Sequence, residues 1–363
     1  MNQKIKMTDR HKPLFSIGVT TYNRRDLLKQ TLLSILEQNF ADFEVIVGND
    51  FPDEALSLEI LGIEDPRVRV INHKRNIGEL ENMNFLRNAA QGRYFTWQFD
   101  DDPCAPTLLS EVYSALIKFN FPPCVFTSFT FIYGTSFHKF KKNYNGQVQL
   151  FSGRDFLRKY LSGNLKVLGC CGFYNTDYLK SIGGAKRLTN GLIALHSEYL
   201  LLIGVGILSK VAYINAPLVS SRIHENSWTC SNSDVKLFEQ AGINLIRESI
   251  VILSNDGLKD DFNKNLSSIL ESVISSVVVK IIMCNNQLHR QEITRYRSLI
   301  EEEFNSLKGS AFYEMAMSGL DTALKNVPWY IFKAKIKMIM PLGCLKFAHL
   351  LLSIILRYTN KPF

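Results

Sequence analysis

The fold is decided by the stretch Arg93-Tyr94-Phe95-Thr96-Trp97-Gln98-Phe99-Asp100-Asp101-Asp102, in which an aromatic run leads directly into three acidic residues. Aromatic side chains favour pleated strands, so this aromatic run is predicted to form one. Three carboxylates at a strand end repel one another unless water solvates them or a divalent cation neutralises them. Mg²⁺ and Mn²⁺ take oxygen ligands, typically one or two carboxylates with substrate phosphates. The triplet alone therefore indicates either a metal site or an acidic surface turn.

Strands and helices alternate over the first 130 residues. This βαβα order predicts a mostly parallel central sheet flanked by helices on both faces. From about residue 234 onward the pattern is almost purely helical. The sequence therefore predicts an α/β fold with a helical C-terminal extension. The expected strands cover residues 15–21, 43–48, 68–71, 94–99, 124–129, 167–174 and 211–214, and the expected helices cover 26–38, 79–90, 106–119, 156–161 and 196–207.

Polar residues follow each of the first four predicted strands. They are Thr20 to Arg24, Asn49-Asp50, Asn72 to Gly78, and the aspartate triplet. The ends of parallel strands lie along one edge of the sheet, where nucleotides bind. No glycine-rich phosphate loop follows the first strand, which disfavours a Rossmann dehydrogenase or a P-loop enzyme. A phosphate at this edge would need a carboxylate-held metal and a few basic groups.

The composition is that of a folded cytosolic protein, with 363 residues, 46% apolar and 21% charged. The seven cysteines have no zinc-like spacing and are expected to be reduced. Residues 1–13 are expected to form a basic N-terminal tail, not a signal peptide.

The net charge of +8 is concentrated at the C-terminal end, because residues 322–363 contain no Asp or Glu and carry seven Lys and Arg residues. The same segment is apolar and contains Trp329 and Tyr330, while Pro341 and Gly343 interrupt it. A basic amphipathic segment suits an anionic membrane surface. The alternatives are a helix docked on the main domain and an oligomer interface. We expect a peripheral protein on the cytoplasmic membrane face and no nucleic-acid partner.

Five motifs follow one another in the first third of the chain. They are Val19 to Arg24, Val45 to Asp50, Asn76-Ile77-Gly78 with Asn82 and Asn84, Ala90 to Tyr94, and Asp100 to Asp102 with Pro106. In this order and spacing they resemble the nucleotide-sugar half of family 2 glycosyltransferases, which are inverting, metal-dependent enzymes of the GT-A fold. Weaker similarity continues to about residue 230, through Ile182-Gly183-Gly184, His196 to Leu200, and Arg222-Ile223-His224. The resemblance implies a GT-A domain over residues 14–230. Residues 231–363 lie outside it, and their pattern predicts a helical region with a basic amphipathic end.

The resemblance also implies roles for individual residues. Asp102 and Asp100, with support from His224, would hold Mn²⁺ or Mg²⁺ as the metal-binding DXD motif. Glu198 would be the general base, with Asp177 and His196 as rivals, because the family commonly has an acidic pair where this chain has Ser197-Glu198. The nucleotide sugar would be bound by Thr20, Tyr22, Asn23, Asp50, Arg75, Asn76, Asp100, Asp101 and Arg222.

The implied function is transfer of a sugar from a nucleotide-diphosphate donor to a saccharide or lipid-linked acceptor. Bacterial surface polysaccharide assembly, such as O-antigen or capsule, would fit this function. One alternative is a nucleotidyltransferase, which would need a triphosphate clamp such as Arg24 and Arg25. The other is a non-catalytic, transferase-like scaffold in a membrane complex.

Overall fold

The computed structural model describes residues 12–135, 140, 146–224, 234–284 and 289–327. Its contacts divide the chain into two compact units. The first contains residues 1–130, 137–187 and 191–221, and the second contains 131–136, 188–190 and 222–363. The boundaries predicted at residues 13 and 230 stay a prediction.

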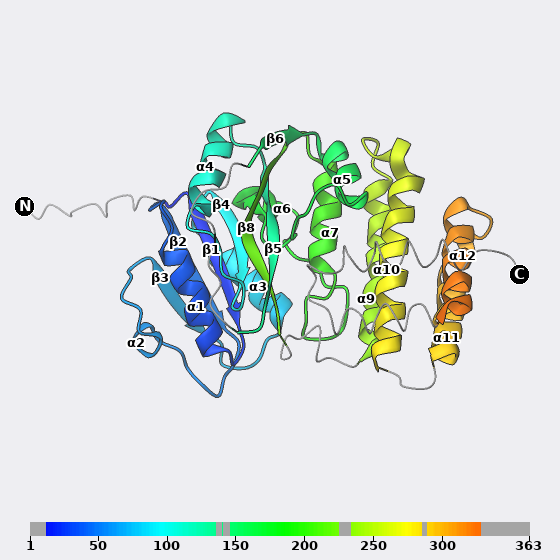
Figure 1. Cartoon of the computed structure of the whole chain (residues 1–363), viewed down its shortest axis with the longest axis horizontal. Helices are drawn as coiled ribbons and strands as arrows, with labels where there is room; N and C mark the ends of the chain where they lie inside the picture. The colour runs from blue at the N-terminus through cyan, green and yellow to red at the C-terminus, as the bar shows by residue number, and fades with distance from the viewer. Residues whose placement is uncertain (1–11, 136–139, 141–145, 225–233, 285–288, 328–363) are drawn as a thin grey trace, which may run out of the picture. The chain divides into compact units, whose positions relative to one another are not determined.

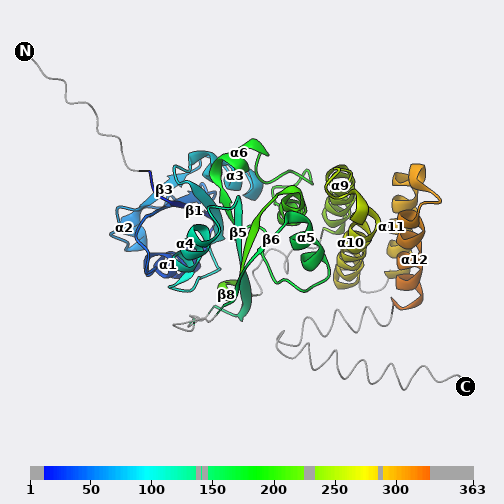
Figure 2. The same ribbon diagram turned by 90° about the horizontal axis from the view of Figure 1, so that it is seen from above.

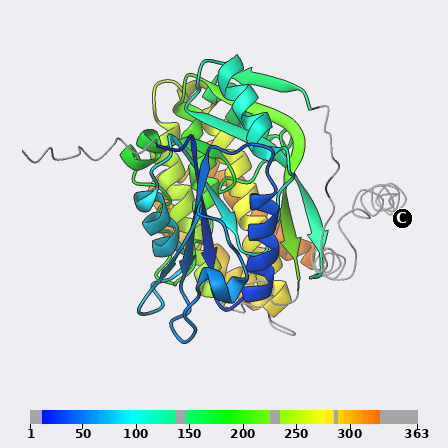
Figure 3. The same cartoon turned by 90° about the vertical axis from the view of Figure 1, so that its left-hand side faces the viewer.

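The first unit is built on an eight-stranded sheet in the order β3-β2-β1-β4-β7-β5-β8-β6 (Figure 1). β1 pairs in parallel with β2 and with β4, and β2 pairs in parallel with β3 (Figure 3). β7 pairs antiparallel with β4 and β5. The strands are β1 (Phe15–Thr21), β2 (Phe43–Asn49), β3 (Val68–Asn72), β4 (Tyr94–Phe99), β5 (Cys124–Tyr133), β6 (Val148–Phe151), β7 (Phe173–Asn175) and β8 (Val211–Ile223).

Helices cover both faces of the parallel half. α1 and α4 lie on one face and α3 and α6 on the other (Figure 2). The aromatic side chains of β4 supply much of the core, since Tyr94, Phe95 and Trp97 are fully buried. The predicted α/β fold with a central sheet and surrounding helices is confirmed. The helices are α1 (Arg25–Leu36), α2 (Leu58–Leu61), α3 (Glu79–Ala89), α4 (Leu108–Lys118), α5 (Gly153–Leu161), α6 (Thr176–Ser181) and α7 (Ser197–Gly204).

The second unit is helical, as predicted. Its helices are α9 (Val235–Leu253), α10 (Phe262–Cys284), α11 (His289–Glu303) and α12 (Ala311–Lys325). α10 packs against α9 and α12 and buries apolar side chains such as Val273, Val277 and Ile281. Residues 259–284 are long and apolar enough to cross a membrane, but 61% of their most apolar window is buried inside the protein. A core helix of a helical bundle has these same properties, so we describe α10 as a core helix.

Two predicted strands differ most from the structure. Only Phe173–Asn175 of the apolar run 167–174 is a strand, and Val167, Cys170 and Cys171 are buried without belonging to one. β8 extends from the predicted 211–214 to Ile223 and passes through Pro217. Its pairing with β6 covers only Val211 to Ile214, so Pro217 lies beyond the part of β8 paired with that strand.

Candidate active site

The parallel strands end in register where the strand order reverses. Thr20 of β1 lies opposite Phe99 of β4, and Thr21 lies opposite Asn49 of β2. β2 and β4 flank β1 on opposite sides, so the connections after them diverge. Ligands of open α/β sheets bind outside the carboxyl ends of strands at such a switch point. The structure thus brings the ends of β1, β2 and β4 together at the predicted edge.

The aspartate triplet is buried at this edge and is joined to the segment after β1. Thr21 Oγ1 donates a hydrogen bond to Asp100 Oδ2 at 2.7 Å. Arg24 Nη1 lies 3.3 Å from Asp100 Oδ1 and 3.1 Å from Asp101 Oδ2. Burial and, after it, the Asp101 charge raise the pKa of Asp100 to about 7, while Arg24 and Thr21 oppose the shift. The site therefore favours an added positive charge.

A divalent cation fits the chemistry of this triplet. Within the described ranges, no three His, Cys, Asp or Glu side chains are grouped so that they could hold an ion by themselves. Mg²⁺ does not require such a cage, because it usually combines one or two carboxylates with phosphate oxygens and water. The backbone of Asp102 is fixed by its amide, which donates to the Phe99 carbonyl at 3.2 Å, and by Gln98 Nε2, which donates to its carbonyl. Asp100 and Asp102 thus offer buried carboxylate oxygens as possible metal ligands, and the backbone of Asp102 is fixed.

An aromatic pair stands beside the ends of β1 and β2. Tyr22 is 49% exposed, and its ring meets that of Phe51 edge-to-face at 5.2 Å between centroids. Asn23 is exposed and has a φ of 53°, a left-handed conformation that Asn tolerates. Phe51 was not predicted as a site residue. The signal was its position directly after Asp50, where the family usually has a small polar turn.

Asp50 and Asn76 shape the loop that follows β3. Asp50 Oδ1 accepts a hydrogen bond from the amide of Ile77 at 2.7 Å, and its Oδ2 accepts one from the amide of Gly78 at 2.8 Å. Asn76 Oδ1 accepts from the Gly78 amide at 2.9 Å. Arg75 is exposed on the same loop. The predicted contacts of these residues with a nucleotide stay predictions.

Glu198 lies in the first turn of α7, in a niche formed by Gly169 and Cys170. The Cys170 thiol donates to Glu198 Oε2 at 3.4 Å, and the amides of Cys170 and Gly169 also hydrogen-bond to the carboxylate. Burial raises the pKa of Glu198 above its ordinary value, and these donors oppose the shift. A raised pKa suits a carboxylate that must exchange a proton near neutral pH. Cys170 was not predicted at the site, because no motif in the sequence marks the residues around it.

The two rival bases are placed differently. His196 is buried, and burial lowers its pKa to about 4, so the ring is neutral near pH 7. Its Nε2 has no hydrogen-bond partner among the described residues. Asp177 is exposed in the first turn of α6. Of the three, Glu198 combines a carboxylate with a half-buried, hydrogen-bonded niche.

The burial of His196 predicts a pH-dependent contribution to stability. Its pKa is about 4 in the folded protein, against about 6.5 in the unfolded chain. The unfolded state binds more protons between these values, so the contribution is complete above about pH 6.5 and is lost as the pH falls toward 4. The control is His196→Asn, because Asn tolerates the φ of 62° at this position. Between pH 7 and pH 5, the unfolding free energy of wild type should fall by about 2 kcal/mol more than that of this variant. Urea unfolding at both pH values measures this difference, and equal losses in the two proteins would contradict it.

Arg222 and His224 belong to the second compact unit. Arg222 is buried, and its Nη1 donates to the carbonyl of Gly134 at 2.7 Å. Their predicted roles toward the diphosphate and the metal stay predictions.

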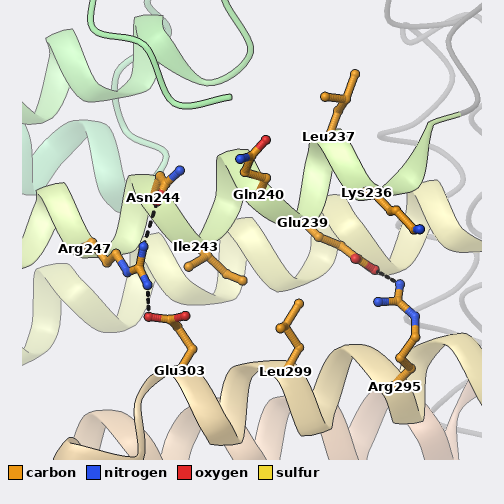
Figure 4. A pocket seen from close by; sticks show the side chains of 10 residues that line it. All are labelled: Lys236, Leu237, Glu239, Gln240, Ile243, Asn244, Arg247, Arg295, Leu299 and Glu303. Atoms are coloured by element: carbon orange, nitrogen blue, oxygen red, sulfur yellow. Dashed lines mark hydrogen bonds and ion pairs between the residues drawn. The ribbon is translucent and has the colours of Figure 1, made fainter. Parts of the chain in front are cut away.

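A groove of about 420 Å³ lies between α9 and α11 in the second unit (Figure 4). Its carboxylates are ion-paired, Glu239 with Arg295 and Glu303 with Arg247. The apolar part of its lining comes from Leu237, Ile243 and Leu299. The charges of these two carboxylates are therefore neutralised by arginines of the groove itself.

Comparison with known structures shows the fold class. The chain is similar to Staphylococcus aureus TarS, residues 1–349, whose crystal structure holds UDP-GlcNAc, with a TM-score of 0.62. The similarity covers 87% of this chain and 91% of TarS at 15% sequence identity. At this identity the likeness defines the GT-A fold.

Sequence comparison identifies the family of residues 16–183. The family described as Glycosyl transferase family 2 matches residues 16–183. A putative colanic acid biosynthesis glycosyl transferase of Escherichia coli, WcaA, is 33% identical over 103 residues, which are 28% of this chain and 37% of WcaA. A GalNAc(5)-diNAcBac-PP-undecaprenol beta-1,3-glucosyltransferase of Campylobacter jejuni is 33% identical over 109 residues, which are 29% of this chain and 34% of that protein. Residues 16–183 are therefore a domain of glycosyl transferase family 2, as predicted. The chain spans about a third of the length of these curated relatives.

Proposed function

We propose that the chain is a metal-dependent, inverting glycosyltransferase that uses a nucleotide-diphosphate sugar. The observation that carries the proposal is the buried aspartate triplet at the β1–β4 switch point of a family 2 domain. Calorimetric binding of nucleotide diphosphates, with and without Mn²⁺, tests it.

The donor would bind along the ends of β1 and β2. Tyr22 and Phe51 offer an aromatic surface for the base, and Thr20 and Asn23 lie on either side of Tyr22 in the chain. Asp50 and Asn76 would act at the base or ribose, and the exposed Arg75 would lie near the base or the diphosphate. The TarS structures contain UDP-GlcNAc and UDP, so a UDP-sugar is the first donor to test.

Asp102 and Asp100 would hold Mn²⁺ or Mg²⁺, with Asp101 ion-paired to Arg24 and His224 as a supporting ligand. The bound ion would offset the negative charge that develops on the leaving diphosphate. Arg222 would contact a phosphate oxygen.

Glu198 would be the general base of the transfer. Its carboxylate would remove the proton from an acceptor hydroxyl, and the hydroxyl oxygen would form a bond to the anomeric carbon. The bond from that carbon to the diphosphate oxygen breaks on the opposite face, which inverts the configuration. The amides and the thiol around Glu198 would hold the carboxylate in place for this step.

We place the acceptor among saccharides or lipid-linked saccharides of bacterial surface polysaccharide assembly. Support comes from the relatives, whose names refer to colanic acid, teichuronic acid and undecaprenol-linked substrates. The protein would then work on the cytoplasmic face of the membrane.

The basic, apolar segment predicted to bind the membrane begins in the last turn of α12, and its residues 328–363 lie outside the described residues. We expect the full chain to float with vesicles that contain phosphatidylserine and not to float with vesicles of pure phosphatidylcholine. A chain ending at the buried Val327 should lose this flotation, because it lacks most of the C-terminal charge. A full chain that ignores anionic vesicles would contradict membrane binding, and a monomeric truncated chain from an oligomeric parent would indicate an interface.

The arginines proposed as a triphosphate clamp have carboxylate partners in the structure. Arg24 pairs with Asp100 and Asp101, and Arg25 Nη1 lies 3.2 Å from Glu54 Oε1. These pairs favour a glycosyltransferase over a nucleotidyltransferase.

A further inference from the structure

The amino end of α3 is fastened to the segment that leads into Glu198. The Glu79 amide donates to the Leu192 carbonyl at 2.6 Å, and Glu79 Oε2 accepts a hydrogen bond from the Ala194 amide at 2.9 Å. Gly78 packs directly against this segment, because a Cβ at Gly78 would lie 2.6 Å from the Leu192 carbonyl oxygen. One residue, Glu79, thus binds segment 191–196 through both its backbone and its side chain.

Two further contacts join α3 to the chain just before this segment. Asn84 donates to the Ala185 carbonyl at 2.8 Å, and its Oδ1 accepts from the Ala185 amide at 3.1 Å. Glu81 and Arg187 form an ion pair at 2.7 Å in which both side chains are well exposed. An exposed pair of this kind contributes little to stability. The half-buried carboxylate of Glu79 is therefore a stronger contact than this exposed pair.

The same end of α3 is tied to the donor side of the sheet. The carboxylate of Asp50, directly after β2, accepts the amides of Ile77 and Gly78, which immediately precede Glu79. Glu79 also interacts electrostatically with Glu198, Arg24 and Asp101. Glu79 is therefore coupled electrostatically to both the acidic strand end and the proposed base.

We propose that Glu79 is a positioning residue, whose carboxylate holds the Ala194 amide so that segment 191–196 presents Glu198 in a fixed place. The catalytic part of this proposal rests on the proposed function of Glu198; the positioning part rests on the contacts alone. An oxygen acceptor is what the Ala194 amide requires, so the charge of Glu79 is not needed for this role.

Hydrogen–deuterium exchange of the full chain tests the positioning directly. We expect Glu79→Ala to speed exchange in peptides covering residues 191–200 by about fivefold, the effect of losing one ordinary hydrogen bond. Glu79→Gln keeps an oxygen acceptor and should remain near wild type. Glu81→Ala, on the same helix, is the matched control and should also remain near wild type. Unchanged exchange over residues 94–99 would show that the sheet is intact.

Turnover supplies the second readout, with UDP release from UDP-GlcNAc as the probe. We expect Glu79→Ala to lower kcat while the Kd for UDP is unchanged, and Glu79→Gln to restore kcat. Equal exchange in Glu79→Ala and wild type would overturn the inference, and so would a Gln variant that matches the Ala variant. Absence of turnover in wild type would count against the proposed function, while the exchange result would still decide the positioning.

Discussion

Glu198→Gln should lower kcat by about 10³-fold and leave the Kd for UDP unchanged. Positioned general bases typically contribute 10²–10⁴-fold to a rate, and Gln has nearly the same shape but does not accept a proton. The niche of Glu198 can also accommodate the amide, because the Cys170 thiol and the amides of Gly169 and Cys170 can still donate to its carbonyl oxygen. The loss should therefore fall on the chemical step. The rate of UDP release from UDP-GlcNAc, with the Kd for UDP from calorimetry, measures both quantities.

The pH dependence of the wild-type rate gives an independent check. Burial raises the pKa of Glu198, and a base acts only when it is deprotonated. The rate should therefore fall as the pH drops through a pKa above the ordinary range of a glutamate.

The control for Glu198→Gln is Asp177→Asn, which removes an exposed carboxylate from the rival position. An active Glu198→Gln variant alongside an inactive Asp177→Asn variant would move the base to α6.

Asp102→Ala should abolish the Mn²⁺-dependent part of nucleotide diphosphate binding, with a loss of at least about 100-fold in affinity. Partners that only orient a metal ligand already contribute 10–100-fold to metal affinity, and a direct ligand contributes more. Asp102 is buried next to Asp100, whose carboxylate is joined to Thr21 and Arg24. Removal of its carboxylate thus leaves the acidic strand end short of a ligand. Calorimetric titration of UDP into the Mn²⁺-loaded variant measures the loss.

The matched control for this change is Asp53→Ala, which removes an exposed carboxylate from the connection after β2. Its UDP affinity should equal that of wild type. If Asp102→Ala bound UDP with Mn²⁺ as tightly as the control, the assignment of Asp102 as a direct ligand would be wrong.

Local pattern was sufficient to predict the sheet edge. β1 and β4 begin and end as predicted, because alternating or continuous apolar runs bounded by polar residues specify a buried strand. The same pattern was misleading at residues 167–174, where the apolar side chains are buried in a connection that wraps the Glu198 niche. Burial and strand pairing are different properties, and periodicity reports only burial.

Contacts between distant segments could not be predicted. The hydrogen bonds from Ile77 and Gly78 to Asp50, and from Ala194 to Glu79, join parts of the chain that no short motif connects. The sequence indicated Asp50 as a nucleotide ligand and gave no signal for Glu79. The contacts of both residues become visible only in the structure, where the loop after β3 lies beside the segment before α7.

The central claim is that a divalent cation and a nucleotide diphosphate bind together at the aspartate triplet. It is tested most directly by calorimetric titration of UDP, GDP, dTDP and CMP into the full chain, with and without Mn²⁺. We predict that one diphosphate binds only when Mn²⁺ is present, which would also identify the base of the donor. A folded protein that binds none of the four nucleotides, with or without Mn²⁺, would contradict the claim and favour a non-catalytic scaffold.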